Sequence, residues 1–408
     1  MGGRHMARPK KPTYEYVAKL NRYRKRIKNA DGKYAAIYGK TPEELTEKLA
    51  EATKQVEEGL VDRAYPTVNA YADLWLELHS PNISYATKQD YRYIIKRHMK
   101  EPLGNFRMAD VTQDNIKAAL LSVADKSESV YQRTVMLYKQ IFDSAVDSNI
   151  IASSPCRKLK SGGVPPKKKH ALSKEQIEIL LNAIRETKVY TFIMVGLYAG
   201  LRREEILGLK WANVVLTGSA PHISVRSALR WEHNRPIVTD TLKSKAATRD
   251  IPIPPQLVEC LKAAKATSNS EHVISDAKGL PLTETQFRNM WHAVICRTVK
   301  ERTYTKYTDA GKVVHTISPQ KGEKASHRKY CYTIDFEVTP HILRHTYISN
   351  LLLSGVDVKT VQYLAGHEHA KITLDIYTHL IYNKPQDLME KVNKAFAVTN
   401  EVKISGEL

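Results

Sequence analysis

The sequence predicts a multidomain α+β protein: a small basic β-sheet with one helix, then an all-α bundle, then a mostly α domain that carries a small antiparallel sheet and a β-hairpin insertion. Three observations lead to this prediction. The 408 residues exceed one ordinary domain. The apolar residues change from strand-like to helical spacing along the chain. The excess positive charge is concentrated at the N-terminal end.

Composition excludes several classes of protein. The chain has 63 Lys and Arg against 43 Asp and Glu, a net charge of +20, and 42% apolar residues. That apolar content excludes wholesale disorder, and no stretch reaches the ~20 uninterrupted apolar residues that a membrane-spanning helix requires. The four cysteines lie far apart without CxxC spacing, so neither a disulfide framework nor a cysteine zinc site is expected. We therefore expect a cytoplasmic protein without a membrane partner.

The N-terminal end is strongly basic. Residues 1–5 are interpreted as an expression-vector scar and left out of the fold prediction. Residues 1–40 hold 12 Lys and Arg and only two acidic residues. A polyanion is the usual partner of such a cluster, because each neutralised phosphate releases counterions. A solvated basic tail is the alternative.

Local patterns favour a folded basic sheet over that tail. Residues 23–28 and 34–38 are strand-like and flank an Asp-Gly pair that suits a hairpin turn. A capping box at Thr41 then begins a helix, so residues 6–62 are predicted to be a small sheet packed by one helix. A basic sheet of this size can enter a DNA groove. The candidate DNA-contacting residues share one strand: Arg24, Lys25, Arg26 and Lys28.

Residues 66–159 are predicted to form the all-α bundle. Val68, Tyr71 and Trp75 recur at helical spacing, and Thr112 caps a later helix of the same region. Residues 160–170 follow with glycine, proline and lysine in a composition typical of a linker. Lys167, Lys168 and Lys169 in this basic linker are candidate phosphate contacts, although solvation alone would also explain them.

Residues 171–408 form the third predicted domain. Ser173 begins a helix as part of a capping box, and residues 189–198 are apolar enough for a buried helix. Alternating runs at 222–225, 236–238 and 250–253 predict one small antiparallel sheet.

Two later segments complete this domain. Residues 302–338 are rich in Tyr and Thr around an Asp-Ala-Gly turn, which predicts a β-hairpin insertion. The chain returns to helix at Thr339-Pro340, and an amphipathic helix is expected at about 383–397, where it could dock on a neighbouring copy.

Arg202 and Arg203 are predicted to lie in the first turn of a helix that starts after Ala199-Gly200. The positive end of the helix dipole disfavours a cation there by ~0.3 to 1 kcal/mol. A phosphate held by the helix start and by both arginines would remove this conflict. The alternative is that Glu204 and Glu205 neutralise the pair.

A second arginine lies on one helical face with histidine. His341 and Arg344 are three residues apart, and His345 follows one turn after His341. The two histidines have the spacing of zinc ligands, but the Glu of HExxH is missing. Arginine with histidine fits a phosphate better, because guanidinium makes bidentate contacts and imidazole moves a proton near neutral pH. We expect no metal site.

Four short segments, in this order, carry a resemblance to a known family. They are Ala-Gly-Leu-Arg-Arg-Glu-Glu-Ile-Leu at 199–207, His-Ile-Leu-Arg-His-Thr at 341–346, Gly-His at 366–367 and Tyr-Thr-His at 377–379. Over residues 170–385 the sequence resembles the tyrosine recombinases of the phage-integrase family. The basic sheet, helical middle domain and Tyr-rich insertion are most similar to the integrases of conjugative transposons.

The resemblance implies a site-specific recombinase that integrates and excises a mobile element. Tyr377 would attack a DNA phosphodiester, leaving a 3′-phosphotyrosyl bond and a free 5′-hydroxyl. Arg202 and Arg344 would hold the non-bridging oxygens, His341 would act as general base, and His367 would donate a hydrogen bond to phosphate. No cofactor, divalent metal or ATP is implied.

The same resemblance implies a lysine on a β-hairpin as the general acid for the leaving oxygen. Lys243 is assigned to this role, although Ser244 stands where relatives often have Thr. Lys245 lies on the same strand face and is the alternative. Glu205 is expected to support the site structurally rather than to react.

Partners and domain roles also follow from the resemblance. Residues 6–62 would be an arm-type DNA-binding domain, residues 66–159 a core-binding domain, and residues 171–408 the catalytic domain. The partner would be double-stranded DNA, bound by a homo-oligomer that becomes a tetramer in the synaptic complex through exchange of the C-terminal helix. The resemblance is also compatible with an accessory DNA-bending or excision protein. It implies a protein that is associated with the bacterial nucleoid. A type IB topoisomerase and a non-catalytic DNA-binding regulator are the alternative functions.

Overall fold

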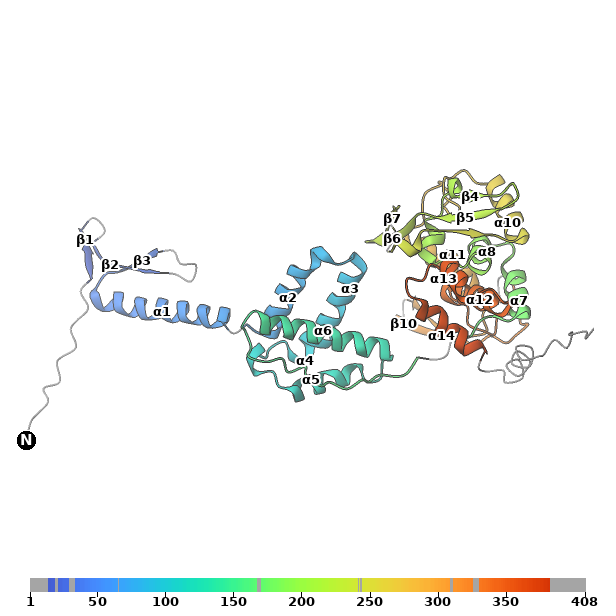
Figure 1. The fold of residues 1–408 in the computed structure, drawn as a ribbon. Helices are drawn as coiled ribbons and strands as arrows, with labels where there is room; N and C mark the ends of the chain where they lie inside the picture. The colour runs from blue at the N-terminus through green and yellow to red at the C-terminus, as the bar shows by residue number, and fades with distance from the viewer. Residues whose placement is uncertain are drawn as a thin grey trace, which may run out of the picture. The chain divides into compact units, whose positions relative to one another are not determined.

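A computed structural model describes residues 14–18, 21–28, 34–64, 66–166, 170–240, 242, 244–308, 311–325 and 330–381. The chain divides into two compact units, residues 1–167 and 168–408, and Figure 1 traces their elements in chain order. The interpreted vector scar at 1–5 and the expected helix at about 383–397 lie outside the described residues. The α+β fold class is confirmed.

The first unit begins with a three-stranded antiparallel sheet and a helix. Its strands are β1 (Glu15–Val17), β2 (Arg22–Lys28) and β3 (Tyr34–Gly39), in the order β1-β2-β3. Helix α1 (Pro42–Ala64) follows, and the Thr41 hydroxyl accepts a hydrogen bond from the Glu44 amide, as a helix cap does. Leu45 on α1 is fully buried, and Gly39 lies so close to it that any side chain there would collide with the Leu45 backbone.

A helical bundle makes up the rest of the first unit. Its elements are α2 (Val68–His79), η2 (Ser80–Asn82), α3 (Tyr85–Ile94), η3 (Ile95–Lys100), α4 (Glu101–Leu103), η4 (Met108–Asp110), α5 (Gln113–Leu120), η5 (Leu121–Val123) and α6 (Glu128–Asp147). Thr112 begins α5 with a complete capping box. Buried residues from these helices form one apolar core that includes Trp75, Ile116 and Phe142.

The second unit has a larger core built mainly from helices. They are α7 (Lys174–Ile184), α8 (Tyr190–Tyr198), α9 (Arg203–Leu207), η6 (Trp211–Asn213), η7 (Lys245–Ala247), α10 (Pro255–Ala266), α11 (Glu284–Ile295), α12 (Pro340–Leu353), α13 (Val358–Ala365) and α14 (Ala370–Ile381). Residues Phe192–Leu197 of α8 are all buried, as expected of a helix that is apolar on every side. Helix α12 packs against α8, α13 and α14, and Figure 1 shows α12, α13 and α14 together.

The sheets of the second unit correct one sequence prediction. Strands β4 (Val214–Val215), β5 (His222–Val225) and β8 (Arg249–Pro252) form one sheet, but β6 (Ala228–Glu232) and β7 (Arg235–Thr239) form a separate hairpin. Residues 236–238 therefore belong to a different sheet from 222–225. The reason is local, because His233 and Asn234 both have positive φ and make the tight two-residue turn that pairs β6 with β7.

The β-hairpin predicted for the segment 302–338 lies at the start of that segment. Strands β9 (Arg302–Thr308) and β10 (Gly311–Ile317) pair as a hairpin, whereas the described part of 318–338 holds only isolated bridges. Among the described residues, no helix has both the length and the apolar content to cross a membrane.

Gly200, between α8 and α9, is a point of close packing. Its φ is +64°, a backbone conformation that disfavours residues with a side chain. A methyl group at this position would also overlap the ring of Tyr347 on α12. The turn that leads into α9 therefore requires glycine for two reasons.

We predict that Gly200→Ala destabilises the second unit by about 2 kcal/mol or more, because it adds overpacking to backbone strain. Thermal or denaturant unfolding measures the effect. Gly218→Ala is the matched control, since Gly218 has φ +88° and open space around it. Equal losses in the two variants would contradict the packing argument.

Candidate active site

Arg202 is the N-cap of α9, because the helix begins at Arg203. Its backbone amide donates to Oε2 of Glu205 at 2.9 Å, and its Nη1 donates to Oε1 at 2.7 Å. Its Nη2 donates to the Gly366 carbonyl at 2.7 Å. Glu205 thus neutralises Arg202, as the alternative interpretation proposed, yet 36% of the Arg202 side chain stays accessible.

Arg344 is buried inside the unit on α12. Its Nη1 donates to the Gly200 carbonyl at 2.8 Å, and its Nη2 donates to the Ala365 carbonyl. Burial, followed by the nearby charge of Arg202, lowers the pKa of Arg344, but a guanidinium stays charged at neutral pH. His341 lies one turn earlier on the same helix and is exposed.

Glu205 carries the negative charge of this cluster and is 4% exposed. Both its oxygens also accept from Arg249 on β8, at 2.8 Å from Nη2 and 3.2 Å from Nη1. Burial raises the pKa of Glu205, but the hydrogen bond and charge of Arg249 and the charge of Arg202 outweigh it and lower the pKa to about 2. Glu205 is therefore ionised throughout the neutral range.

The C-terminal end of α13 holds all three arginines. Three consecutive carbonyls accept from three different guanidinium groups: Leu364 from Arg249, Ala365 from Arg344, and Gly366 from Arg202. These carbonyls have no partner within the helix and carry the negative end of its dipole, so cations are favoured there. The turn continues directly into His367, because Gly366 takes the left-handed conformation at φ +62°.

His367 is buried, and its Nδ1 lies 2.9 Å from the Thr373 hydroxyl. Burial lowers the pKa of His367, the charges of Arg344 and Arg202 lower it further, and it falls to about 4. The imidazole is therefore neutral at neutral pH. Thr373 is fully buried on α14, and Tyr377 lies one turn later on the same helical face, half-buried beside the core.

Together these contacts make an anion site. The cluster holds three guanidinium groups and one carboxylate, that of Glu205, which binds Arg202 and Arg249. Arg344 donates to the Gly200 carbonyl instead. The cluster therefore has excess positive charge, and Arg202 brings part of it to the surface. The His367 imidazole lies beside the cluster, and α14, the helix that carries Tyr377, packs against α12 and α13. This arrangement can hold a phosphate while a tyrosine attacks it.

The sequence pattern of the Phage integrase family matches residues 170–384. The pattern of the phage integrase N-terminal SAM-like domain matches residues 67–120. The chain belongs to the phage integrase family. It is a tyrosine recombinase, an enzyme that cleaves and religates DNA, and this membership favours the recombinase over the topoisomerase and the regulator.

Curated relatives cover most of the integrase. It is 25% identical over 386 residues to a "Tyrosine recombinase XerC-like" protein of Caldanaerobacter subterraneus subsp. tengcongensis, covering 88% of this chain and 91% of the relative. It is 25% identical to the ICEBs1 integrase of Bacillus subtilis (75% and 77% covered) and 22% identical to the transposase from transposon Tn916 of Enterococcus faecalis (86% and 83%).

Solved structures share the fold. A Tn1549 transposon integrase in complex with circular intermediate DNA has a TM-score of 0.61 at 19% identity, covering 80% of this chain and 99% of that one. A lambda integrase tetramer bound to a Holliday junction has a TM-score of 0.52 at 15% identity, covering 88% and 96%.

The structure describes only some of the basic residues that are predicted to contact DNA or to act as general acid. Lys243 and Lys167, Lys168 and Lys169 lie outside the described residues, as does the side chain of Lys28. Lys245 begins the short helix η7 of the integrase. On β2, Arg24 is paired with Glu15 at 2.7 Å, whereas Lys25 and Arg26 are exposed.

Sequence reasoning missed Arg249 and Thr373. Arg249 had a detectable signal, because it occupies an inward position of β8, in the same alternation as Ile251, where a charge is uncommon. The signal for Thr373 was weaker: it lies one helical turn before Tyr377 in the sequence.

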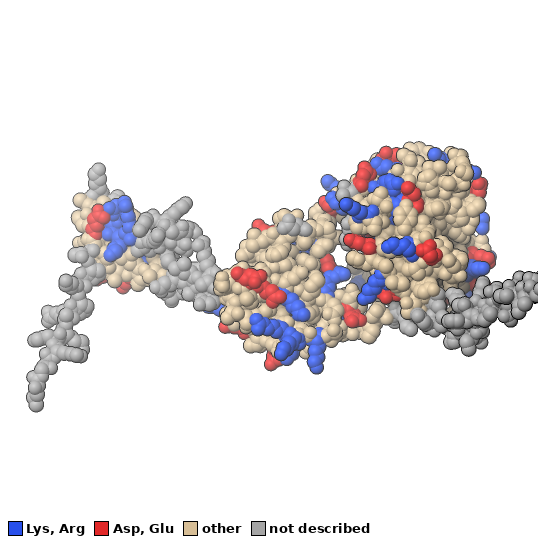
Figure 2. All heavy atoms as spheres, in the orientation of Figure 1, with Lys and Arg blue, Asp and Glu red and all other residues tan. Residues whose placement is uncertain are grey.

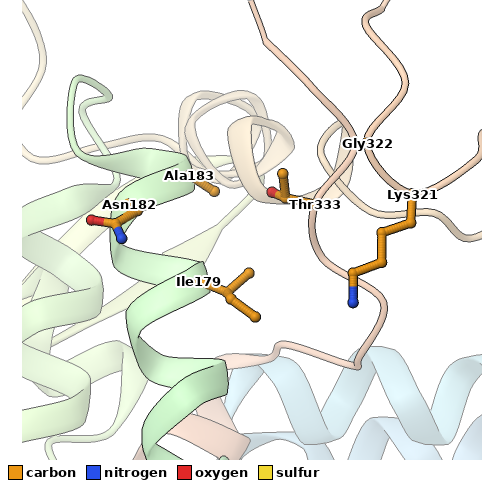
Figure 3. A pocket seen from close by; sticks show the side chains of 6 residues that line it. All are labelled: Ile179, Asn182, Ala183, Lys321, Gly322 and Thr333. Atoms are coloured by element: carbon orange, nitrogen blue, oxygen red, sulfur yellow. The ribbon is translucent and has the colours of Figure 1, made fainter.

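A hollow of about 480 Å³ lies elsewhere in the second unit. Figure 3 shows Ile179, Asn182 and Ala183 of α7 on one side and Lys321, Gly322 and Thr333 on the other. None of the arginines of the cluster lines it. This hollow is therefore separate from the arginine cluster.

We predict that protonation of His367 destabilises the integrase as the pH falls from about 6.5 to about 4. Because its folded pKa lies below the ordinary value, the unfolded chain binds a proton in this window that the folded chain does not. The loss is up to about 3 kcal/mol at 1.4 kcal/mol per pKa unit. Unfolding curves across this window measure it.

His367→Gln should remove this component of the pH dependence. His369→Gln, which changes an exposed histidine two residues away, is the control and should retain it. A wild-type slope in His367→Gln would contradict the assignment of the titration to His367.

Proposed function

We propose that this integrase cuts and rejoins DNA at specific sites through a covalent bond between Tyr377 and a 3′-phosphate. The convergence of Arg202, Arg344 and His367 at the end of α13, beside the helix that carries Tyr377, supports the proposal most strongly. The reaction would integrate and excise a mobile element. We place it in the cytoplasm, on the bacterial chromosome.

Each residue of the cluster has a role in this proposal. The Tyr377 oxygen forms a bond to phosphorus as the bond to the 5′-oxygen breaks, and His341 accepts the phenol proton. Arg202 and Arg344 bind the non-bridging oxygens, where negative charge is redistributed in the transition state. Lys243 gives a proton to the leaving 5′-oxygen. Attack by a 5′-hydroxyl reverses these steps and reseals a strand without ATP, because the phosphotyrosyl bond keeps the energy of the phosphodiester.

His367 suits the role of a neutral hydrogen-bond donor. If the Thr373 hydroxyl donates to Nδ1, the neutral ring carries its proton on Nε2 and can donate it to a phosphate oxygen. The arginine charges already disfavour an imidazolium in the free protein. The phosphate is therefore neutralised by the arginines, which supply the positive charge that a divalent metal supplies in other phosphoryl-transfer enzymes.

The remaining parts of the chain are proposed to hold DNA. Figure 2 shows basic side chains gathered on the small N-terminal sheet, with acidic atoms beside them. Lys25 and Arg26 are exposed there. We assign residues 6–62 to arm-type sites and residues 66–159 and 171–408 to the crossover site. The solved relatives include DNA complexes and a tetramer, which supports double-stranded DNA as partner and a tetramer in synapsis. An accessory DNA-bending or excision protein completes the proposal.

We predict that Tyr377→Phe abolishes covalent attachment and leaves DNA binding intact, because only the nucleophilic oxygen is lost. The assay is a protease-sensitive adduct at the 3′ end of radiolabelled nicked duplexes, formed in EDTA. Tyr363→Phe is the control, since Tyr363 is exposed on α13 and its hydroxyl accepts from the Asp250 amide. An adduct of wild-type yield in Tyr377→Phe would reject the nucleophile.

We predict that Lys243→Ala slows cleavage by about 10²- to 10⁴-fold, the usual contribution of general acid catalysis. A substrate with sulfur in place of the leaving 5′-oxygen should restore the rate, because a thiolate leaves without a proton. Lys245→Ala is the matched control. Sulfur rescue of Lys245→Ala with no rescue of Lys243→Ala would move the role to Lys245.

A further inference from the structure

Arg249 is the most deeply buried charged residue among those described, with 1% of its surface exposed. It begins β8, where Arg249 and Ile251 face the interior and Asp250 and Pro252 face outward. A charge in an interior position destabilises the fold unless it is fully paired. An arginine here therefore needs an explanation from its contacts.

Its contacts join three segments that are distant in sequence. Nη2 and Nη1 donate to the two oxygens of Glu205, Nη1 also donates to the Ala247 carbonyl at 2.7 Å, and Nε donates to the Leu364 carbonyl at 2.8 Å. One guanidinium thus connects the first turn of α9, the end of η7 and the end of α13. Each of these elements lies next to a residue of the proposed reaction. The start of α9 follows Arg202, η7 follows Lys243 in the sequence, and the end of α13 precedes His367.

The turn before His367 is shaped around this guanidinium. A Cβ at Gly366 would lie 2.8 Å from Nη1 of Arg249 and 3.1 Å from the Ala246 carbonyl oxygen. Gly366 is therefore the residue that allows the turn to approach Arg249 this closely. The position of His367 depends on that approach.

Arg202 and Arg249 both bind the Glu205 carboxylate, so the loss of Arg249 would change the position of Arg202. Each oxygen of Glu205 accepts one hydrogen bond from Arg202 and one from Arg249. Without Arg249, the carboxylate would keep only the Arg202 donors and would be free to turn toward that side chain. The Arg202 guanidinium would then move with it, away from the orientation that also satisfies Gly366.

We propose that Arg249 is a positioning residue of the recombination reaction: it fixes Glu205 and the α13–His367 turn so that Arg202 and His367 face the same phosphate. This inference rests on the proposed function of the cluster. Arg249 does not touch the phosphate in this proposal, because all its described contacts are to protein groups in the interior. It acts through Arg202 and His367.

The proposal predicts that the reaction rate of an Arg249 variant depends on pH in a way that loss of packing alone would not cause. The charged groups around Glu205 are Arg202 before α9, Arg249 on β8 and Arg344 on α12, and His367 lies beside the same three arginines. Arg249 is the strongest influence that keeps the pKa of Glu205 low. Removing it lets burial raise that pKa, so Glu205 would gain a proton in mild acid and release Arg202.

The test is the single-turnover rate of covalent adduct formation by the full chain on saturating nicked duplex, at about pH 8 and about pH 5.5. We expect Arg249→Met to react about 10- to 100-fold more slowly at the higher pH, the range found when residues that support a reactive centre are removed. The deficit should grow at the lower pH. DNA affinity should be unchanged.

Two further variants keep the test decisive if Arg249→Met does not fold. Arg249→Lys keeps the charge but cannot reach Glu205 and the Leu364 carbonyl together, so it should be slower than wild type without the added loss in acid. The double variant Glu205→Gln/Arg249→Met removes both interior charges and should be slow at both pH values. Arg288→Met, which changes an exposed arginine paired with Glu284, should react like wild type.

Three outcomes separate the possibilities. A wild-type rate in Arg249→Lys and in the double variant would overturn the positioning role. So would a loss in Arg249→Met that is equal at both pH values and matches a fall in its unfolding midpoint, because that result describes general destabilisation. Failure of the wild-type protein to form any adduct would instead reject the proposed function.

Discussion

The site depends on the C-terminal end of one short helix. Three carbonyls at the end of α13, those of Leu364, Ala365 and Gly366, each bind a different arginine. These carbonyls have no helical partner, and the helix dipole adds negative charge at this end. The helix end therefore gathers three like charges that would otherwise repel one another. Because α13 leads straight into His367, the same interaction also places the imidazole.

The buried carboxylate of Glu205 complements this helix end. It accepts four hydrogen bonds, two from Arg202 and two from Arg249, so neither arginine is left unpaired in the interior. The cluster has one negative charge, on Glu205, and three positive charges, on the arginines, so it can bind an anion. A bound phosphate would supply it, which means that the features that stabilise the fold also create the affinity for the substrate.

The surrounding charges also determine the protonation states of Glu205 and His367. Glu205 stays ionised because its pKa is about 2, and His367 stays neutral because burial and the arginines hold its pKa near 4. The cluster therefore keeps one charge state across the neutral range. Two glycines make the geometry possible: Gly200 presents its carbonyl to Arg344, and Gly366 lets the turn approach Arg249.

The sequence by itself determined the fold class, the helix starts at Thr112, Ser173 and Thr339, and the motifs that identify the family, because caps, apolar periods and short motifs are local. It placed residues 236–238 in the wrong sheet, since strand pairing is not local. Only the tertiary structure decided that Arg249 belongs to the site and that three arginines meet at α13. Those contacts join residues 21 to 164 positions apart, and no pattern along the chain shows which distant backbone carbonyl a buried guanidinium will bind.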